Sequence, residues 1–262
     1  MATVFAIANQ KGGVGKTTTS VNLAASLAAT RRAVLLIDLD PQGNATMGCG
    51  VDKRELALSS YDVLMGNCGI AEATRTLPAL GLDLLPANAD LTGAEVSLLE
   101  ELGRELRLKL AIERIKDRYT HIIIDCPPSL NMLTVNALVA AEAVIVPTQC
   151  EYYALEGISA LVETVEKIRK ILNPVLHIEG FLRTMYDPRN NLANQVSQQL
   201  IKHFGDKVYR TIIPRNVRLA EAPSHGLPAL LYDKSSAGAL AYLALAGEML
   251  RRDDAQRAAA GN

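Results

Sequence analysis

Two lysines and a threonine in a glycine-rich stretch near the N-terminus are the residues best suited to chemistry in this sequence. The stretch reads Asn9-Gln10-Lys11-Gly12-Gly13-Val14-Gly15-Lys16-Thr17-Thr18. Glycines let successive backbone N–H groups turn toward one anion, a lysine can reach the outer phosphates of a nucleotide, and a neighbouring hydroxyl can bind Mg²⁺. The pattern therefore predicts a nucleoside triphosphate and Mg²⁺ as ligands, with all residues from Lys11 to Thr18 in contact with the nucleotide.

The loop departs from the general phosphate-loop pattern at two positions. Gln10 stands where that pattern has glycine, and Lys11 adds a second positive charge at the mouth of the loop. Lysine is a compact charge on a flexible stem and is well suited to phosphate. We expect Lys16 to neutralise the phosphates of its own nucleotide, whereas Lys11 is expected to point away and to serve catalysis on a second subunit.

Acidic residues follow two other apolar runs. Asp38 and Asp40 come after Ala33–Ile37, and Asp125 comes after a run of three isoleucines. Carboxyl ends of parallel strands meet at the ligand-binding edge of a sheet. We expect Thr17 to bind Mg²⁺ directly, Asp125 to hold it through water, and Asp40 to orient the attacking water or reach the metal. Asp38 is expected to hold Lys16 or Thr17 in place.

The identity of the nucleotide and the rate of its hydrolysis can also be predicted. No Asn-Lys-x-Asp motif for reading guanine occurs in the sequence, so ATP is the expected nucleotide. No arginine is obviously placed to stabilise the transition state within one chain, and such a group is worth about 10³–10⁵ in rate. We therefore expect an ATPase with slow basal turnover, which a second subunit or a partner stimulates.

Apolar runs and helical patterns alternate along the chain. This alternation predicts one doubly wound α/β domain, with a mostly parallel sheet flanked by helices. Apolar residues spaced three or four apart predict a long amphipathic helix over Thr92–Asp117, and a last helix is expected over Ala237–Arg252, capped by Ser235 or Ser236. We expect the ATPase domain to span residues 1–252, followed by a polar, frayed tail over 253–262.

Charge and cysteine usage limit the class of protein. The 262 residues include 27 basic and 28 acidic side chains, a net charge of −1, so binding to nucleic acid would need a local patch or pooled patches in an oligomer. The four cysteines form no CxxC pair, which makes zinc unlikely and indicates reduced thiols. No signal-peptide pattern and no run of 18 apolar residues are visible, so a cytoplasmic protein without membrane binding is expected.

Several motifs together resemble the ParA/MinD family of ATPases with a deviant Walker A loop. Lys11-Gly12-Gly13-Val14-Gly15-Lys16-Thr17 resembles the loop itself, Asp38–Thr46 resembles switch I, and Asp125-Cys126-Pro127-Pro128-Ser129 resembles Walker B with switch II. Two further stretches, Gln149–Gly157 and Ile213–Gly226, are similar to the ParA/Soj branch in particular. The resemblance covers the chain from Thr3 to about Glu248.

The resemblance implies a chromosome- or plasmid-partition ATPase associated with the nucleoid. Such proteins form an ATP-sandwich homodimer in which Lys11 would touch the partner's phosphates. The dimer binds double-stranded DNA without sequence preference, and a ParB-type partner stimulates hydrolysis and releases it. Arg189 and Arg218 match DNA-contacting arginines of the branch, Arg215 is a further candidate, and the segment of Pro214 and Asn216 resembles the adenine-side contact.

Three other functions remain open on the residues alone. A membrane-positioning ATPase of the MinD type would need a basic amphipathic C-terminal helix, but this chain ends in a polar, alanine-rich tail. An iron–sulfur reductase of the nitrogenase iron-protein type would need two bridging cysteines, of which Cys126 is the best candidate. A small-molecule ligase or kinase would need an acceptor site, for which no motif is visible. The family also includes members that position protein clusters.

Overall fold

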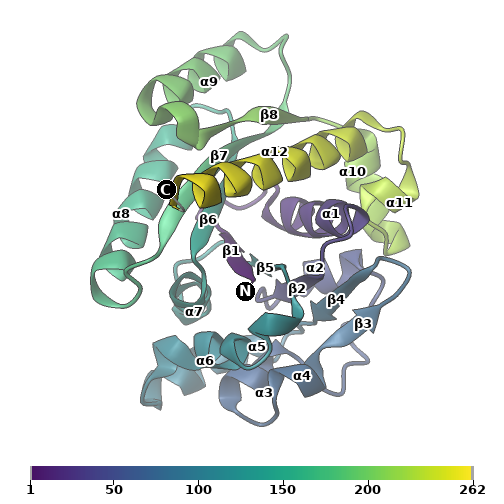
Figure 1. The fold of residues 1–262 in the computed structure, drawn as a ribbon, viewed down its shortest axis with the longest axis vertical. Coiled ribbons are helices and arrows are strands. Elements are labelled where there is room, and N and C mark those ends of the chain that lie inside the picture. The colour runs from purple at the N-terminus through teal and green to yellow at the C-terminus, as the bar shows by residue number, and fades with distance from the viewer. Residues whose placement is uncertain (1, 261–262) are drawn as a thin grey trace.

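A mostly parallel sheet lies at the centre of the computed structural model, which describes residues 2–260, with side chains as far as residue 254 (Figure 1). In this part of the chain the sheet has eight strands in the order β3-β4-β2-β5-β1-β6-β7-β8, and only β3 runs antiparallel to its neighbour. The expected fold class is therefore confirmed. The strands are β1 Thr3–Ile7, β2 Val34–Asp38, β3 Arg75–Leu77, β4 Leu82–Leu85, β5 His121–Asp125, β6 Ala143–Gln149, β7 His177–Tyr186 and β8 Val208–Pro214.

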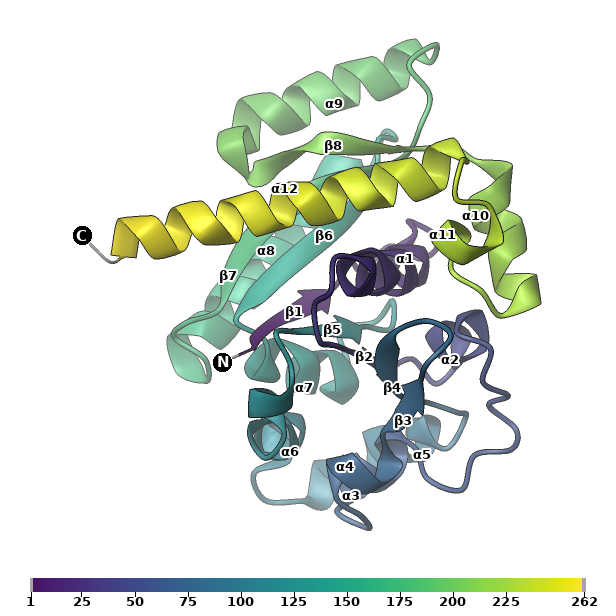
Figure 2. The ribbon, with the colours of Figure 1, turned by 45° about the vertical axis from the view of Figure 1, so that its right-hand side comes forward.

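Helices cover both faces of the sheet (Figures 1 and 2). Side chains alternate between the faces along each strand, so Phe5 and Ile7 pack against α1 and α12, while Val4 and Ala6 face the core beneath α7 and α8. The helices are α1 Lys16–Ala29, α2 Asn44–Gly48, α3 Ser60–Met65, α4 Ile70–Ala73, α5 Leu91–Ser97, α6 Arg107–Glu113, α7 Met132–Ala140, α8 Ala154–Ile171, α9 Asn191–Phe204, α10 Val217–Glu221, α11 Ala229–Tyr232 and α12 Ala237–Ala260. Among the residues described, no helix is long and apolar enough to cross a membrane.

Strand register brings the expected functional residues to one edge. Ile7, the last residue of β1, is the register partner of Asp125, and Asp125 is also the partner of Asp38. Because β1, β2 and β5 are parallel neighbours, the glycine-rich loop after β1 and both acids lie at the carboxyl edge of the sheet. The predicted meeting of these segments is confirmed.

The long helix expected over Thr92–Asp117 is wrong. The segment is broken into α5, α6 and three short 3₁₀ turns, and Gly103, with φ of 68°, interrupts it in the left-handed region. A residue in that conformation cannot continue a right-handed helix. Leu102 is 96% exposed, and Val96 and Leu99 are also exposed, so the apolar spacing does not mark one buried face.

The last helix is longer than expected. It continues to Ala260 instead of ending at Arg252, because residues 253–260 contain good helix formers and neither glycine nor proline. Its start agrees with the prediction, since Ser236 Oγ accepts a hydrogen bond of 3.3 Å from the main-chain N–H of Ala239. Residues 261 and 262 of the predicted tail lie outside the described part of the chain.

Candidate active site

The phosphate loop is held in place by the two strands on one side of it. Gly13 and Gly15 have φ of 73° and 88°, a conformation that glycine adopts without strain. The Thr184 hydroxyl of β7 donates a hydrogen bond of 2.8 Å to the carbonyl oxygen of Val14. Asn9 Nδ2 donates to the carbonyl oxygen of Pro147, in β6, at 2.8 Å. The loop is therefore anchored to β6 and β7 by side-chain hydrogen bonds.

Lys16 begins α1 and lies inside this loop. Its side chain is buried, and Nζ donates a hydrogen bond of 3.1 Å to the main-chain oxygen of Lys11. Burial lowers the pKa of Lys16, while the nearby Asp125, Cys126 and Asp40 act in the opposite direction. A buried ammonium with a single carbonyl acceptor in the described part of the chain is suited to receive phosphate oxygens.

Asp125 ends β5 and is fully buried. Its Oδ1 accepts a hydrogen bond of 2.7 Å from the Ser20 hydroxyl, whereas Oδ2 has no hydrogen-bond partner among the described residues. Burial, and after it the charge of Asp38, raises the pKa of Asp125 well above its usual range, although the Ser20 and Thr17 hydroxyls lower it. A buried carboxylate with a free oxygen beside a hydroxyl on α1 fits a cation-binding role.

Asp40 lies at the same edge of the sheet. Its side chain is buried, and Oδ1 accepts a hydrogen bond of 2.9 Å from the main-chain N–H of Gln42. Asp40 is close enough to Lys16 to oppose the lowering of that lysine's pKa. The structure therefore brings together Asp40, Asp125 and the phosphate-loop lysine, as the sequence predicts.

Asp38 has a different role from the one expected. It does not hold Lys16 or Thr17; its Oδ2 accepts two hydrogen bonds of 2.8 Å from Thr46, one from the main-chain N–H and one from the hydroxyl. The Thr46 hydroxyl also accepts a hydrogen bond of 2.9 Å from the N–H of Ala87. Burial raises the pKa of Asp38, and these hydrogen bonds oppose the rise. Asp38 therefore fixes the first turn of α2 and ties it to the segment after β4.

The donor set suits Mg²⁺ that is bound together with a nucleotide. Within the described residues, no three His, Cys, Asp or Glu side chains cluster as a complete metal site. Mg²⁺ is typically held by one or two carboxylates, substrate phosphates and water, and not by an all-protein cage. Thr17, Asp125 and Asp40 fit this partial set, and the unpartnered Oδ2 of Asp125 is the observation that supports the fit.

The Lys11 side chain is paired with an acid from another loop. Its Nζ forms an ion pair with Glu151 Oε2 at 2.5 Å, and Glu151 lies just after β6. The Lys11 and Glu151 side chains are 38% and 47% exposed. Lys11 therefore points to the surface beside the loop, but it has a partner within its own chain. No local pattern indicates that partner, because 140 residues separate the two.

The expected adenine-side segment lies at the end of β8. Pro214 is the last residue of this strand and is the register partner of Tyr186. Asn216 is the N-cap of α10, and its Oδ1 accepts a hydrogen bond of 3.3 Å from the N–H of Leu219. The side-chain oxygen of Asn216 therefore caps α10, while its amide NH₂ group takes no part in the capping hydrogen bond.

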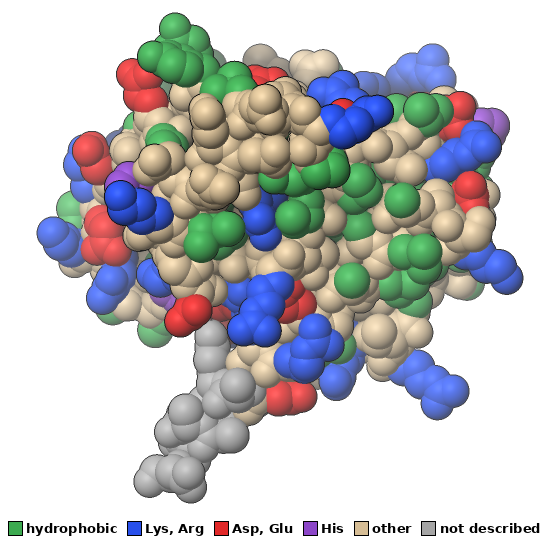
Figure 3. All heavy atoms as spheres, turned by 90° about the horizontal axis from the view of Figure 1, so that it is seen from above, with side chains coloured by type: hydrophobic (Ala, Val, Ile, Leu, Met, Phe, Trp, Pro, Cys, Tyr) green, Lys and Arg blue, Asp and Glu red, His purple; other side chains and the backbone are tan. Residues whose placement is uncertain are grey.

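The three candidate DNA-contacting arginines lie on the surface. Arg189 pairs with Asp187 at 2.8 Å, and Arg218 pairs with Glu221 at 2.7 Å. Arg215 is exposed and has no ion pair with any described residue. Figure 3 shows lysine and arginine side chains at several places on one face of the molecule, with acidic side chains between them.

Arg183, which belongs to the same arginine-rich third of the sequence, is not a surface residue. It is only 7% exposed, and the register of β7 and β8 shifts on both sides of it. Its Nη1 donates to Ser197 Oγ at 3.0 Å, and Nη2 donates to the carbonyl oxygens of Tyr209 and Arg210 at 2.9 and 3.3 Å. The guanidinium thus replaces missing ladder hydrogen bonds where β8 bulges, so it is unsuited to contact DNA.

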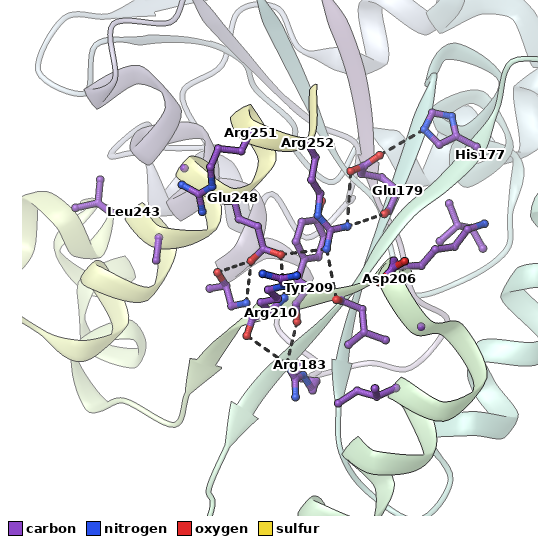
Figure 4. A pocket seen from close by; sticks show the side chains of 18 residues that line it. His177, Glu179, Arg183, Asp206, Tyr209, Arg210, Leu243, Glu248, Arg251 and Arg252 are labelled. Atoms are coloured by element: carbon purple, nitrogen blue, oxygen red, sulfur yellow. Dashed lines mark hydrogen bonds and ion pairs between the residues drawn. The ribbon is translucent and has the colours of Figure 1, made fainter. Parts of the chain in front are cut away.

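A groove of about 1310 Å³ lies beside the first residues of β7 and β8, at the end of the sheet opposite to the phosphate loop (Figure 4). Glu248 accepts hydrogen bonds from the N–H groups of Arg210 and Thr211 at 2.9 and 2.8 Å. Arg252 donates to Glu248 at 3.0 Å and lies 4.2 Å from the centre of the Tyr209 ring. The hydrogen bonds of Glu248 and Arg252 hold α12 on the bulged edge strand, and we assign the groove no part in nucleotide chemistry.

Cys126 is unsuited to hold an iron–sulfur cluster in this structure. Its side chain is fully buried, and burial together with Asp125 raises the pKa of the thiol. The thiolate is the form that binds metals. The predicted reduced state agrees with the structure, in which all four cysteines are free.

Comparisons with known proteins agree with this site. A family model described as an AAA domain matches residues 2–178. The chromosome partitioning protein ParA of Caulobacter vibrioides is 53% identical over 259 residues, covering 98% of this chain and 97% of that protein. The chromosome-partitioning ATPase Soj of Treponema pallidum is 50% identical over 253 residues, covering 97% and 99%.

One similar solved structure contains a bound nucleotide and magnesium. The crystal structure of cobyrinic acid a,c-diamide synthase from Mycobacterium smegmatis, with bound ADP and magnesium, superposes with a TM-score of 0.85. It is 40% identical and covers 97% of this chain and 96% of that one. The chain described above carries the phosphate loop, the buried acid and the hydroxyls that such ligands require. It belongs to the AAA-domain family and, within that family, to the ParA/Soj-type partition ATPases, with ATP and Mg²⁺ as its cofactors.

Proposed function

We propose that this ATPase works as a nucleotide-controlled dimer that binds DNA without sequence preference and is released when a ParB-type partner stimulates hydrolysis. The observation that carries the proposal is the second lysine of the loop. Lys16 is buried and belongs to the nucleotide of its own chain, whereas Lys11 is half-exposed at the mouth of the loop. An exposed lysine beside a phosphate site is available to a second copy of the chain.

Each group at the sheet edge would have a distinct task in hydrolysis. Lys16 neutralises the β- and γ-phosphate oxygens, and the N–H groups from Gly12 to Thr18 bind the phosphates. Thr17 and Asp125 would hold Mg²⁺, which when bound neutralises charge that develops on the phosphates. Asp40 would orient the attacking water. Lys11 would add a positive charge from the second subunit, in the manner of an arginine finger.

Binding of DNA would rest on the exposed arginines, pooled across two subunits. A chain with a net charge of −1 has no strong attraction for DNA as a whole. A dimer doubles the number of exposed arginines such as Arg189, Arg215 and Arg218 on one assembly. Arg215 forms no ion pair among the described residues, although Asp187 is close enough to interact with its charge, so we expect it to contribute more per residue than Arg189 or Arg218. The protein would then be found on the nucleoid when ATP is bound.

The experiment is ATP turnover with and without duplex DNA and a candidate ParB N-terminal peptide. Slow basal turnover that DNA and the peptide raise together is the expected result. Lys16→Ala should abolish nucleotide binding, and Asp40→Ala should keep binding, stop turnover and trap the dimer. Lys11→Ala should impair dimerisation and turnover more than nucleotide binding. A Lys11→Ala protein that dimerises and turns over normally would disprove the role in trans.

One solved relative names a second candidate function. The Mycobacterium smegmatis protein is described as a cobyrinic acid a,c-diamide synthase. That function predicts ATP turnover that depends on cobyrinic acid and an ammonia source, at a rate independent of DNA and of protein concentration. The same turnover assay therefore separates the two functions, and flotation with liposomes tests the membrane-positioning alternative.

A further inference from the structure

Lys11 is held by its own chain in three ways. Its main-chain N–H donates to Asn9 Oδ1 at 3.0 Å, and its carbonyl oxygen accepts from Lys16 Nζ at 3.1 Å. Its side chain reaches across to the loop after β6, where Nζ meets Glu151 Oε2 at 2.5 Å. The backbone is thus anchored by the phosphate loop, while the ammonium is held by a residue that takes no other part in the site.

The place of Glu151 makes this ion pair relevant to assembly. The two residues that follow it, Tyr152 and Tyr153, are 75% and 68% exposed and pack edge to face with ring centres 5.0 Å apart. Exposed tyrosines are enriched in protein interfaces because they combine apolar area with a polar tip. Lys11, Glu151 and the two tyrosines therefore form one surface beside the nucleotide loop, suited to a second copy of this chain.

A lysine ammonium that is paired with a carboxylate is not free to neutralise another anion. To reach a phosphate on a second subunit, Lys11 must separate from Glu151, because the carboxylate and the phosphate compete for the same compact charge. Half-exposed ion pairs are weak enough to exchange, since solvent already screens them. The pair can therefore act as a reversible restraint without locking the site.

We propose that Glu151 is a positioning residue that restrains Lys11 on its own subunit and so opposes formation of the ATP-bound dimer until phosphate from a second subunit takes the place of the carboxylate. The inference rests on the proposed role of Lys11 in trans. It adds a defined competitor for that lysine within each chain, and it predicts that this competitor raises the protein concentration at which dimers form.

The size of the effect follows from the exposure of the pair. Surface ion pairs of this kind bias an equilibrium by up to about fivefold. A symmetric dimer uses two such lysines, so the two contributions multiply to at most about 25-fold in the dimer dissociation constant. Because the interaction is electrostatic, the effect should shrink as ionic strength rises.

The test is Glu151→Gln, which keeps the size and polarity of the side chain and removes its charge. The dimer dissociation constant is measured by sedimentation with a non-hydrolysable ATP analogue and Mg²⁺, and we expect it to fall about 2- to 25-fold. Binding of the analogue to monomers should stay within twofold. Glu156→Gln is the matched control, because Glu156 is exposed, lies five positions further on and forms no ion pair among the described side chains.

A double-mutant cycle separates a restraint on Lys11 from a general change in the surface. In a Lys11→Ala background, Glu151→Gln should no longer change dimerisation, since the lysine that it restrains is gone. Glu151→Asp, which is one methylene shorter but keeps the charge, should stay closer to the wild type than Glu151→Gln. Thermal unfolding of each variant checks that the fold is intact.

The outcomes distinguish the restraint from the function on which it rests. If the wild type forms no dimer with the ATP analogue, the proposed function fails. If it forms a dimer that needs Lys11, but Glu151→Gln leaves the dissociation constant unchanged or raises it, the restraint is refuted while the function stands. An equal gain from Glu156→Gln would also refute it, because any lost negative charge would then suffice.

Discussion

Replacement of the buried Arg183 by methionine should destabilise the protein without directly affecting its nucleotide site. Arg183 donates hydrogen bonds to Ser197 Oγ and to the carbonyl oxygens of Tyr209 and Arg210. Methionine has a similar length and no donor, so those three acceptors lose their partner. The two carbonyl oxygens lie where β8 bulges away from β7, and no strand hydrogen bond can replace the guanidinium there.

The magnitude follows from two opposing contributions. Three hydrogen bonds from a charged donor are each worth about 1.5–3 kcal/mol, which gives a gross loss of roughly 4.5–9 kcal/mol. Removal of the cation also ends the cost of burying it, a cost that shows in the lowered pKa of Arg183 and amounts to several kcal/mol. The net loss of unfolding free energy should therefore be about 2–4 kcal/mol, or roughly 5–15 °C in Tm for a protein of this size.

Urea unfolding followed by circular dichroism measures this loss, with Arg215→Met as the control for an exposed arginine. Arg215→Met should change the free energy of unfolding by less than about 0.5 kcal/mol and should weaken DNA binding. Arg183→Lys should recover little of the lost stability, because one ammonium cannot span all three acceptors. An Arg183→Met protein with wild-type stability and weakened DNA binding would refute the structural role and return Arg183 to the DNA surface.

Three further predictions concern the carboxylates of the site. The pKa of Asp125 is raised, so the folded protein without Mg²⁺ holds a proton that the unfolded chain has lost; stability should fall from pH 6 to 8 by up to about 1.4 kcal/mol per pH unit. Thermal melts of the wild type with EDTA and with Mg²⁺-ADP, and of Asp125→Asn, check this. Mg²⁺-ADP and Asp125→Asn should each flatten the slope of stability against pH. The slope that remains in Asp125→Asn measures any contribution of His177, whose pKa is also raised. Thr46→Val removes the hydrogen bond that the Thr46 hydroxyl donates to Asp38 and the one that it accepts from Ala87, and should cost about 1–3 kcal/mol in urea unfolding. Ser20→Ala removes the hydroxyl that donates a hydrogen bond to Asp125 Oδ1. The Mg²⁺ concentration for half-maximal turnover should then change at least about threefold, and an unchanged Mg²⁺ dependence would contradict the assigned site.

The parts of the fold that the sequence predicts are those fixed by local pattern. Runs such as Ile122–Ile124 are apolar throughout because the central strands are buried on both faces. The glycine-rich loop can be predicted from the sequence because its conformation needs glycine, as the positive φ angles of Gly13 and Gly15 show. Once these two signals place the strands in parallel, the meeting of Asp38, Asp125 and the loop at one edge follows from topology.

The parts that could not be predicted depend on partners far away in the sequence. Asp38 bonds to Thr46 instead of Lys16, because its carboxylate lies against the first turn of α2, a helix too short to have a periodic pattern. Arg183 looks like its charged neighbours in sequence, yet a change of register between β7 and β8 buries it. The pairing of Lys11 with Glu151 depends on the adjacency of β1 and β6, which no spacing between the two residues reveals.

The exposed segment between α5 and α6 shows how periodicity alone can mislead. Val96, Leu99 and Leu102 have helical spacing, yet all three are exposed. The helical backbone ends at an extended Glu101, just before the left-handed Gly103, so no continuous face forms. Apolar spacing indicates a buried face only if the backbone stays helical over the whole window. The glycine was the one local sign of the break.

Affinity for duplex DNA of arbitrary sequence, measured by fluorescence anisotropy with ATP and with ADP over a range of salt concentrations, tests the central claim most directly. We expect strong binding with ATP, little with ADP, and a logarithmic salt slope that grows by about 0.9 for each phosphate neutralised. Lys11→Ala should lower the ATP-dependent affinity, and Arg215→Ala should lower both affinity and slope. Equal affinity in ATP, ADP and high salt would contradict the account.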